Sequence, residues 1–125
     1  PELGRYRPTV VKDFPSFLGT MAKPKDDEPE LLERFEIFIG SLELANGFSE
    51  LTDPKELERR MRKVSSALER DGLPGTRVDR EFLEASARLG RCAGVSVGMD
   101  RLAMLAMGAD EISEVIFPFR AWENR

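Results

Sequence analysis

Three glutamates recur at intervals of seven residues within an otherwise apolar stretch of the chain. Glu36, Glu43 and Glu50 lie in the segment FEIFIGSLELANGFSEL, which also contains Asn46. Carboxylate and amide oxygens are the ligands that hard divalent cations such as Mg²⁺ prefer. The sequence has no histidine, which excludes histidine metal ligands and histidine-based catalytic triads. We therefore expect any metal in this protein to be bound by oxygen, with Mg²⁺ as the first candidate.

The same stretch predicts a β-hairpin over residues 34–48. Gly40-Ser41 suits a two-residue turn of type II′, because glycine occupies its first central position. In that register Glu36 and Glu43 emerge on one face as diagonal neighbours, with Cα atoms roughly 7–8 Å apart. Two carboxylates at this separation repel each other, and a divalent cation between them would relieve the repulsion. The alternative is a sheet with one solvated face, on which glutamates are ordinary.

Asn46 interrupts the alternation of the second strand of this hairpin. Strict alternation would put Asn46 on the apolar face, opposite Phe35. Either the strand ends there, or Gly47 forms a bulge that turns Asn46 to the polar side. In the second case one polar surface would carry Glu36, Glu43, Asn46 and Glu50.

A second candidate site lies in CAGVSVGMDRLAML, residues 92–105. The predicted strand in this segment has one face made only of small residues, which are Cys92, Gly94, Ser96 and Gly98. Such a face lets a flat ligand or another backbone approach closely. Arg101 follows in the first turn of a helix, where a cation opposes the helix dipole, so binding of phosphate oxygens would explain its place. The alternative is a close contact between strand and helix, with an ordinary surface arginine.

The remaining pattern predicts an α+β fold, in which an antiparallel sheet is flanked by helices. Asp53 and Pro54 are typical of an N-cap and a first helical residue, and Gly72 is typical of a helix end. In chain order we expect a strand at 9–11, an exposed loop at 20–30, the hairpin, helices at 53–72, 79–89 and 99–107, a helical turn at 110–114 and a strand at 115–119.

Length and composition restrict the kind of protein. The chain has 125 residues, of which 41% are hydrophobic and 34% charged, with a formal net charge of -4. This composition suffices for one domain with a core, and its charge gives no electrostatic reason to bind nucleic acid or an anionic membrane. No run has the length of a transmembrane helix, and the single cysteine, Cys92, fits a cytoplasmic protein. Because the sequence starts at proline, we expect the chain to be part of a longer protein.

Together, RFEIFIGSLELANGFSELTDP and GVSVGMDRL resemble the C-terminal half of the catalytic domain of class II lysyl-tRNA synthetases. GVSVGMDR is similar to class II motif 3, and the resemblance runs from about Pro8 to Phe119. Within this family, CAGVSVGMDRLAMLAMGAD and GLPGTRVDREFLEA resemble the branch of elongation factor P–(R)-β-lysine ligases, as does a small non-glycine residue at Ser96. MAKPKDD, and Ser49 in GFSEL, are instead similar to the true synthetases. We favour the ligase branch.

The resemblance implies roles in binding ATP and the amino acid. Glu36 and Glu43 would hold Mg²⁺ against ATP. ATP itself would contact Glu43, Leu44, Gly98 and Arg101, with Arg101 on the γ-phosphate side as the expected catalytic residue. The amino-acid substrate would contact Asn46, Phe48, Glu50 and Ser96.

Among the substrate contacts, Phe48 would line the side-chain pocket. Glu50 would pair with the substrate's ammonium group through a charge-assisted hydrogen bond. Ser96 adds bulk to the floor of the site, and we hypothesise that this shifts preference from lysine toward β-lysine.

The implied function is that of an ATP-dependent ligase. The carboxylate of lysine or β-lysine would attack the α-phosphate of ATP, and the resulting aminoacyl-adenylate would donate its acyl group to elongation factor P or tRNA(Lys). Residues 1–125 would form a single partial catalytic domain, the motif 3 half, with motifs 1 and 2 absent. We expect a cytoplasmic homodimer, paired through the missing N-terminal part, with no membrane partner, and we expect residues 1–125 alone to be inactive.

Two other interpretations stay open. One is a non-catalytic nucleotide- or partner-binding domain derived from the synthetase fold. The other is a structural remnant that pairs with another chain to cover its sheet.

Overall fold

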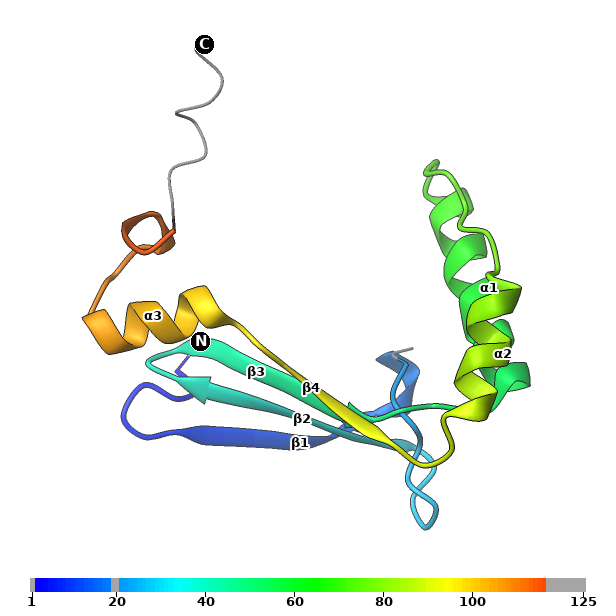
Figure 1. Cartoon of the computed structure of the whole chain (residues 1–125), viewed down its shortest axis with the longest axis horizontal. Coiled ribbons are helices and arrows are strands. Elements are labelled where there is room, and N and C mark those ends of the chain that lie inside the picture. Colours follow the sequence, from blue (N-terminus) through cyan, green and yellow to red (C-terminus); the bar gives the residue numbers. More distant parts are fainter. Residues whose placement is uncertain (1, 19–20, 117–125) are drawn as a thin grey trace. The chain divides into compact units, whose positions relative to one another are not determined.

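The structure is a computed structural model and describes residues 2–18 and 21–116. Within these residues one antiparallel sheet has the strand order β1-β2-β3-β4 (Figure 1). The elements are β1 (Thr9–Pro15), η1 (Ser16–Leu18), β2 (Leu31–Ile39), β3 (Leu42–Ser49), α1 (Pro54–Arg70), α2 (Arg80–Arg88), β4 (Ala93–Val97), α3 (Met99–Met107) and η2 (Ile112–Glu114), where η marks a 3₁₀ helix. The predicted α+β fold is therefore confirmed. None of the described helices has the length and hydropathy needed to cross a membrane.

The chain divides into two compact units. Unit 1 holds the described residues of Pro1–Val11, Phe35–Gly47 and Val95–Arg125, and unit 2 holds those of Lys12–Arg34 and Phe48–Gly94. Every strand contributes residues to both units. Helices α1 and α2 belong to unit 2, whereas α3 belongs to unit 1.

A two-residue turn joins β2 and β3, as predicted, but its type differs. Gly40 and Ser41 both have positive φ values, 58° and 66°. Positive φ at both central residues defines a type I′ turn, whereas the predicted type II′ requires it only at the first. The turn has the predicted length, so the hairpin register is unaffected by this correction.

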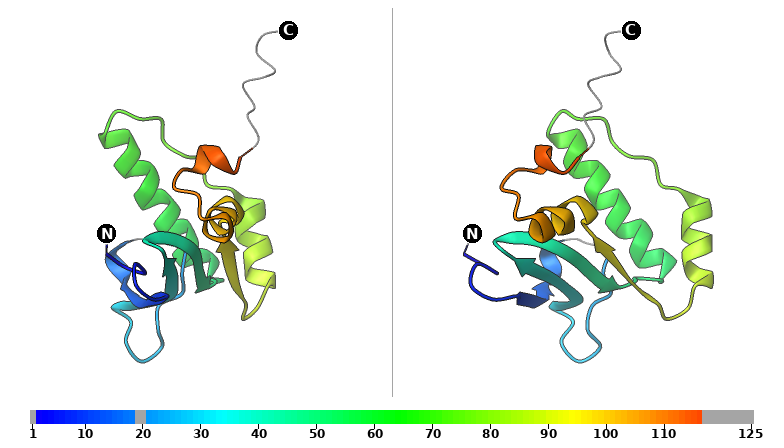
Figure 2. Two further views of the ribbon diagram at one scale, coloured as in Figure 1. Left: turned by 90° about the vertical axis from the view of Figure 1, so that its left-hand side faces the viewer. Right: turned by 60° about the vertical axis from the view of Figure 1, so that its left-hand side comes forward.

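In unit 1, α3 runs alongside the turn end of the β2–β3 hairpin (Figures 1 and 2). A methyl group added at Gly40 would lie 3.0 Å from the Cδ2 atom of Leu105, which belongs to α3. Gly98 is the N-cap of this helix, and Gly108, with φ of 67°, ends it. Both boundaries agree with the prediction from the sequence.

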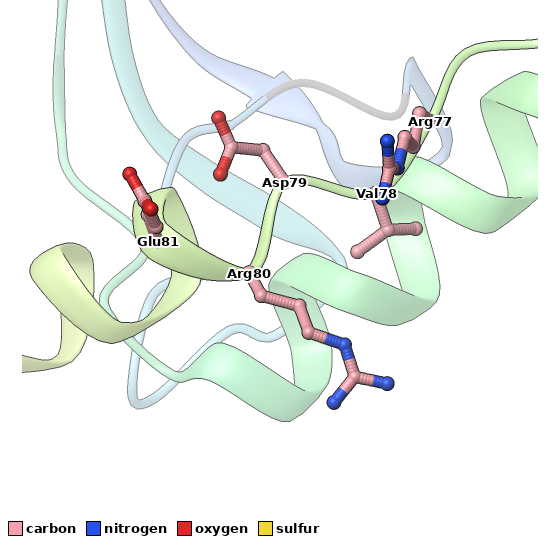
Figure 3. Close-up of a pocket in the computed structure, with 5 residues that line it drawn as sticks. All are labelled: Arg77, Val78, Asp79, Arg80 and Glu81. Atoms are coloured by element: carbon pink, nitrogen blue, oxygen red, sulfur yellow. The ribbon is translucent and has the colours of Figure 1, made fainter.

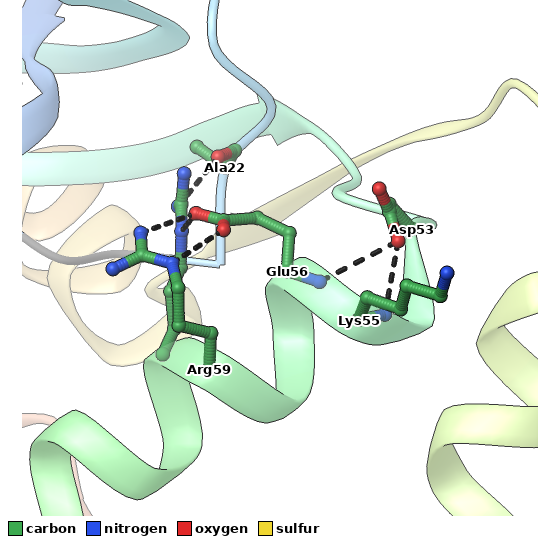
Figure 4. Close-up of polar contacts among 6 residues, drawn as sticks. Ala22, Asp53, Lys55, Glu56 and Arg59 are labelled. Carbon is green, nitrogen blue, oxygen red and sulfur yellow. Dashed lines mark hydrogen bonds and ion pairs between the residues drawn. The ribbon is translucent and has the colours of Figure 1, made fainter.

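In unit 2, α1 and α2 pack on a small apolar core. The core consists of Leu51, Leu57 and Leu83, with Met21, Met61 and Val78 packed against it. Helix α1 begins as predicted, because the Asp53 side chain accepts hydrogen bonds from the backbone N–H groups of Lys55 and Glu56 (Figure 4).

The loop predicted at 20–30 is wrong in part. Ala22 is fully buried and forms an isolated antiparallel bridge with Glu50. Pro24 forms a second bridge, with Leu32. Proline lacks an N–H group and weakens a strand pattern, so this pairing could not be predicted from the sequence.

Hydrogen bonds of Lys23 show where this segment lies. The Lys23 N–H donates to the Ser49 carbonyl at 2.8 Å, and the Lys23 carbonyl accepts from the Glu33 N–H at 2.9 Å. In unit 2 the segment therefore runs between the start of β2 and the end of β3, bonded to both.

Two further boundaries differ from the prediction. Strand β1 continues to Pro15 instead of ending at residue 11. The strand expected at 115–119 does not begin at Val115, because Val115 and Ile116 form a turn after η2. Residues 117–119 lie outside the described residues.

Candidate functional site

The site residues predicted from the sequence fall in both units. Unit 1 carries Glu36, Glu43, Leu44, Asn46, Ser96, Gly98 and Arg101, and unit 2 carries Phe48 and Glu50. Most of them lie on strands, whereas Arg101 belongs to α3 and Glu50 directly follows β3.

In unit 1, β3 and β4 are joined at Leu44, whose carbonyl accepts a hydrogen bond from the Gly98 N–H at 2.8 Å. Counting two residues along each antiparallel strand places Asn46 opposite Ser96. Residues opposite each other share one face of a sheet, with Cβ atoms about 4.5–5.5 Å apart. Two predicted substrate-binding residues are thus cross-strand neighbours.

Asn46 has a buried acceptor with no hydrogen-bond partner in the described part of the chain. This acceptor is its Oδ1 atom. A buried polar atom without a partner costs about 1–3 kcal/mol. The position therefore fits a hydrogen-bond donor supplied by a bound molecule, such as an amine.

Strand alternation nevertheless places Asn46 and Glu43 on opposite faces of the sheet. Strand β3 continues to Ser49, so it does not end at Asn46. Ala45 and Gly47 are buried, whereas Asn46 between them is half-buried, as alternation requires. Residues three apart in a regular strand point to opposite faces. The single polar surface expected from the sequence is therefore not produced by alternation alone.

Glu36 and Glu43 lie on paired strands near the turn. The two-residue turn keeps the register in which these glutamates are diagonal neighbours on one face. The described residues contain no group of three or more Asp, Glu, Cys or His side chains that could hold a metal. Mg²⁺ is usually held by one or two carboxylates together with phosphate oxygens. This pair therefore fits Mg²⁺ that is bound with a nucleotide.

Arg101 lies beside Glu43 in unit 1. Its Nη1 group donates a hydrogen bond to the backbone carbonyl of Glu43. A methyl group added at Gly98 would lie 3.3 Å from the Cδ atom of Arg101, so the side chain passes close to this glycine. The present bond has one ionised partner, the guanidinium, whereas a bond to a phosphate oxygen would have two and would gain the attraction between opposite charges. An anionic ligand would therefore compete well with this carbonyl for the exposed guanidinium.

In unit 2, Phe48 and Glu50 line a cavity of about 420 Å³. Its other described lining residues are Met21, Leu51, Thr52, Leu57, Phe82, Ser86, Leu89, Cys92 and Ala93, so Glu50 is the only charged residue among them. The Glu50 carboxylate makes no hydrogen bond or ion pair with another described residue. A cavity of this size, with apolar walls and one carboxylate, suits an alkyl chain that ends in an ammonium group.

Gly94 leaves room for the Glu50 carboxylate. The Glu50 N–H donates to the Cys92 carbonyl at 2.9 Å, which places Phe48 opposite Gly94 on the neighbouring strand. A methyl group added at Gly94 would lie 3.3 Å from the Oε1 atom of Glu50. In unit 2, Gly94, one of the small residues predicted on this strand face, thus leaves space for the Glu50 carboxylate.

Glu50 also lines a smaller cavity, of about 120 Å³, together with Lys23 and Glu33. The Lys23 ammonium binds Asp26 at 2.8 Å and Glu33 at 2.9 Å, and these two contacts raise the pKa of Lys23. Hydrogen bonds from Ser49 and then Lys23 lower the pKa of Glu33. Lys23 is thus paired with these two carboxylates, and among the described residues neither Lys23 nor Arg91, the other cation that lines this cavity, forms an ion pair with Glu50.

Several residues that line the cavity of Phe48 and Glu50 were not predicted from the sequence. Ser86 lines it from α2 and stands three positions after Leu83, the other buried residue of that helix, which is a signal present in the helical pattern. Met21 had no such signal, because it lies in the segment expected to be an exposed loop.

A hollow of about 520 Å³ lies at the start of α2, lined by Arg77, Val78, Asp79, Arg80 and Glu81 (Figure 3). Asp79 caps the helix, with its carboxylate accepting a hydrogen bond from the Phe82 N–H at 3.0 Å. Two arginines and two acidic residues balance in charge there, and none of the predicted site residues lines this hollow. It is not a strong candidate for the functional site.

Comparison with known proteins gives a consistent family. A family model described as tRNA synthetases class II (D, K and N) matches residues 2–120. A curated relative, the elongation factor P–(R)-β-lysine ligase of Histophilus somni (strain 2336), is 44% identical over 117 residues, which are 93% of this chain and 36% of the relative. The protein of the same name from Salmonella heidelberg (strain SL476) is 38% identical over the same shares. The chain thus spans 36% of the length of these relatives.

Proposed function

Because the chain belongs to the family of class II tRNA synthetases (D, K and N), we propose that it is part of an ATP-dependent ligase. The ligase activates lysine or β-lysine as an aminoacyl-adenylate. The names of its relatives favour β-lysine as the amino acid and elongation factor P as the acceptor, over lysine and tRNA(Lys).

The observation that carries this proposal is the cavity lined by Phe48 and Glu50. Its apolar walls match the methylene chain of a lysine-type side chain, and the carboxylate without a described partner matches the terminal ammonium group. A hydrogen bond to a charged group contributes about 1.5–3 kcal/mol. This is enough to select an amine over an apolar side chain of the same size.

The proposed reaction requires no nucleophile from the protein. The carboxylate of the amino acid attacks the α-phosphate of ATP, which forms the aminoacyl-adenylate and releases pyrophosphate. Catalysis then depends on positioning the reactants and on stabilising negative charge. Phe48 and Glu50 hold the amino-acid side chain, and the unpaired acceptor of Asn46 receives a hydrogen bond from a substrate amine.

The nucleotide would be bound by residues of unit 1. Arg101 binds on the γ-phosphate side, and Leu44 and Gly98 contact the nucleotide. Glu36 and Glu43 hold Mg²⁺, which when bound neutralises phosphate charge. Because the matched relatives are longer than this chain, we propose that motif 1, with the dimer interface, and motif 2, with an arginine for the α-phosphate, come from outside residues 1–125.

The test is amino-acid-dependent exchange of pyrophosphate into ATP by the full-length protein, with lysine, (R)-β-lysine and leucine compared. Glu50→Gln should raise the KM for the amino acid by about 10–100-fold, because it removes the charge from that hydrogen bond. The KM for ATP should not change. Glu58→Gln is the matched control, since it removes a carboxylate from an ion pair on the surface of α1.

Two outcomes would contradict the proposal. One is an unchanged amino-acid KM in Glu50→Gln. The other is ATP binding with no amino-acid-dependent exchange, which would favour a non-catalytic nucleotide-binding domain.

A further inference from the structure

Arg60 is a buried charged residue that the proposed reaction does not use. It lies on α1 and is only 7% exposed. Its Nε group donates to Glu56 at 2.8 Å, and its Nη1 group donates to the Ala22 carbonyl at 3.0 Å. Burial of a guanidinium costs several kcal/mol unless its charge is paired and its N–H groups are bonded, and an apolar residue would serve a helix core at lower cost. The contacts of Arg60 therefore indicate that this residue has a specific structural role.

The backbone on both sides of Glu50 is bonded to the segment that Arg60 reaches. The Leu51 N–H donates to the Met21 carbonyl at 3.1 Å, and the Lys23 N–H donates to the Ser49 carbonyl at 2.8 Å. The segment of residues 21–23 is thus attached before and after Glu50.

Ala22, in the middle of this segment, connects Arg60 with Glu50. Ala22 is fully buried and forms an antiparallel bridge with Glu50. Its carbonyl accepts the hydrogen bond from Arg60. On the other side, the Glu50 N–H donates to the Cys92 carbonyl. The backbone of Glu50 is therefore held between two neighbouring segments, one of which is bonded to α1.

We propose that Arg60 is a positioning residue for the amino-acid site. By binding the Ala22 carbonyl, it holds the 21–23 segment against Glu50 and so fixes the direction in which the Glu50 carboxylate enters the cavity. Glu56 orients the guanidinium for this contact. The inference rests on the proposed function for its consequence in catalysis, because it assumes that Glu50 binds the substrate's ammonium group.

The arrangement predicts a selective effect on amino-acid binding. Met21, in the same segment, lines the cavity with Glu50, so release of the segment disturbs both the wall and the carboxylate. The residues proposed to bind ATP belong to unit 1, whereas Arg60 and its contacts belong to unit 2. A general loss of structure would instead affect both substrates.

The experiment compares Arg60→Met and Arg60→Lys with wild type in the full-length protein. Arg62→Met is the matched control, because Arg62 lies on the same helix, is exposed and binds Glu58. The readouts are the KM for each substrate and kcat in pyrophosphate exchange, and the hydrogen-exchange rates of the Lys23 and Leu51 amides.

In Arg60→Met we expect the amino-acid KM to rise about tenfold, as for loss of one charged hydrogen bond. The ATP KM and kcat should stay unchanged, and both amides should exchange faster. For Arg60→Lys, the amino-acid KM and the exchange rates of both amides should lie between those of wild type and Arg60→Met. One ammonium group cannot reproduce the two directed contacts of a guanidinium. Arg62→Met should resemble wild type in every readout.

Unchanged protection of the Lys23 and Leu51 amides in folded Arg60→Met would overturn the inference, as would equal losses for both substrates. If wild type shows no amino-acid-dependent exchange, the proposed function fails, and the amide comparison still decides whether Arg60 holds the segment. If Arg60→Met does not fold, the same readouts on Arg60→Lys decide the question.

Discussion

Two glutamates of unit 2 show how neighbours decide what a residue does. Glu56 accepts a hydrogen bond from Arg59 (Figure 4). It accepts another from Arg60, so its negative charge is paired within the protein. Glu50 lines an apolar cavity and has no polar side-chain partner among the described residues. A carboxylate of the first kind supports structure, whereas one of the second kind is available to a cationic ligand.

Gly94→Ala tests the room that the Glu50 carboxylate needs. The added methyl group would lie 3.3 Å from Glu50 Oε1, which is close enough to displace the carboxylate. We expect a higher KM for the amino acid in pyrophosphate exchange, with little change in the thermal unfolding midpoint. In a Glu50→Gln background the same substitution should have a smaller effect, because neighbouring residues are coupled. Equal effects in both backgrounds would contradict this explanation.

Ser96→Gly tests the choice between lysine and β-lysine. Ser96 lies opposite Asn46 across β3 and β4, so its side chain shares a face with a proposed substrate contact. Removing the hydroxymethyl group should shift the ratio of kcat/KM values toward lysine by roughly tenfold, which is the usual effect of one small group in a pocket. The ratio is measured by exchange with each amino acid, and an unchanged ratio would rule out this role for Ser96.

At the scale of elements, residues in the first turns of helix α1 connect this helix to the segment of residues 21–23. Asp53 caps the helix, and Glu56 in the first turn holds Arg60, which reaches Ala22. The hydrogen bond from Arg59 is the largest influence that lowers the pKa of Glu56, to about 2. Burial opposes this shift, and the hydrogen bond from Arg60 adds to it.

This low pKa predicts an acid-sensitive contribution to stability. Glu56 has a lower pKa in the folded state than its ordinary 4.5. Its contribution is therefore complete above about pH 4.5 and is lost as the pH falls toward 2. Thermal unfolding of the full-length protein should show that Glu56→Gln destabilises clearly at about pH 6 and less at about pH 3.

The control for this measurement is Glu58→Gln, which breaks an ion pair on the exposed side of the same helix. Exposed pairs contribute about 0–1 kcal/mol, so this variant should resemble wild type at both pH values. A Glu56→Gln effect that is the same at both pH values would contradict the assignment.

At the scale of the whole molecule, the residues proposed to bind ATP all belong to unit 1, whereas those proposed to bind the amino acid belong to both units, with Asn46 and Ser96 in unit 1 and Phe48 and Glu50 in unit 2. The chain also spans only 36% of its curated relatives. We therefore expect a protein made of residues 1–125 alone to catalyse no lysine-dependent pyrophosphate exchange. The full-length protein is the positive control, and robust exchange by residues 1–125 would show that no further segment is needed.

The amino-acid sequence by itself determined the features that depend on neighbouring residues. The start of α1 at Asp53 and Pro54, the end of α3 at Gly108 and the length of the hairpin turn were all predicted correctly. Caps, turns and alternation involve side chains and backbone groups only a few positions apart, so their signals are legible in a linear sequence. The motif residues indicated the family for the same reason, since they stand close together in two short segments.

Only the tertiary structure decided the features that depend on distant partners. The type I′ turn, the pairing of the 21–23 segment and the place of Met21 in the wall of the cavity at Glu50 were not predicted. The contact of Arg60 with Ala22 joins residues 38 positions apart, and nothing in either local sequence identifies the other. The Ala22 carbonyl satisfies one of the N–H groups of the buried Arg60 guanidinium, and folding alone brings these two groups together, so this pairing is a property of the folded chain.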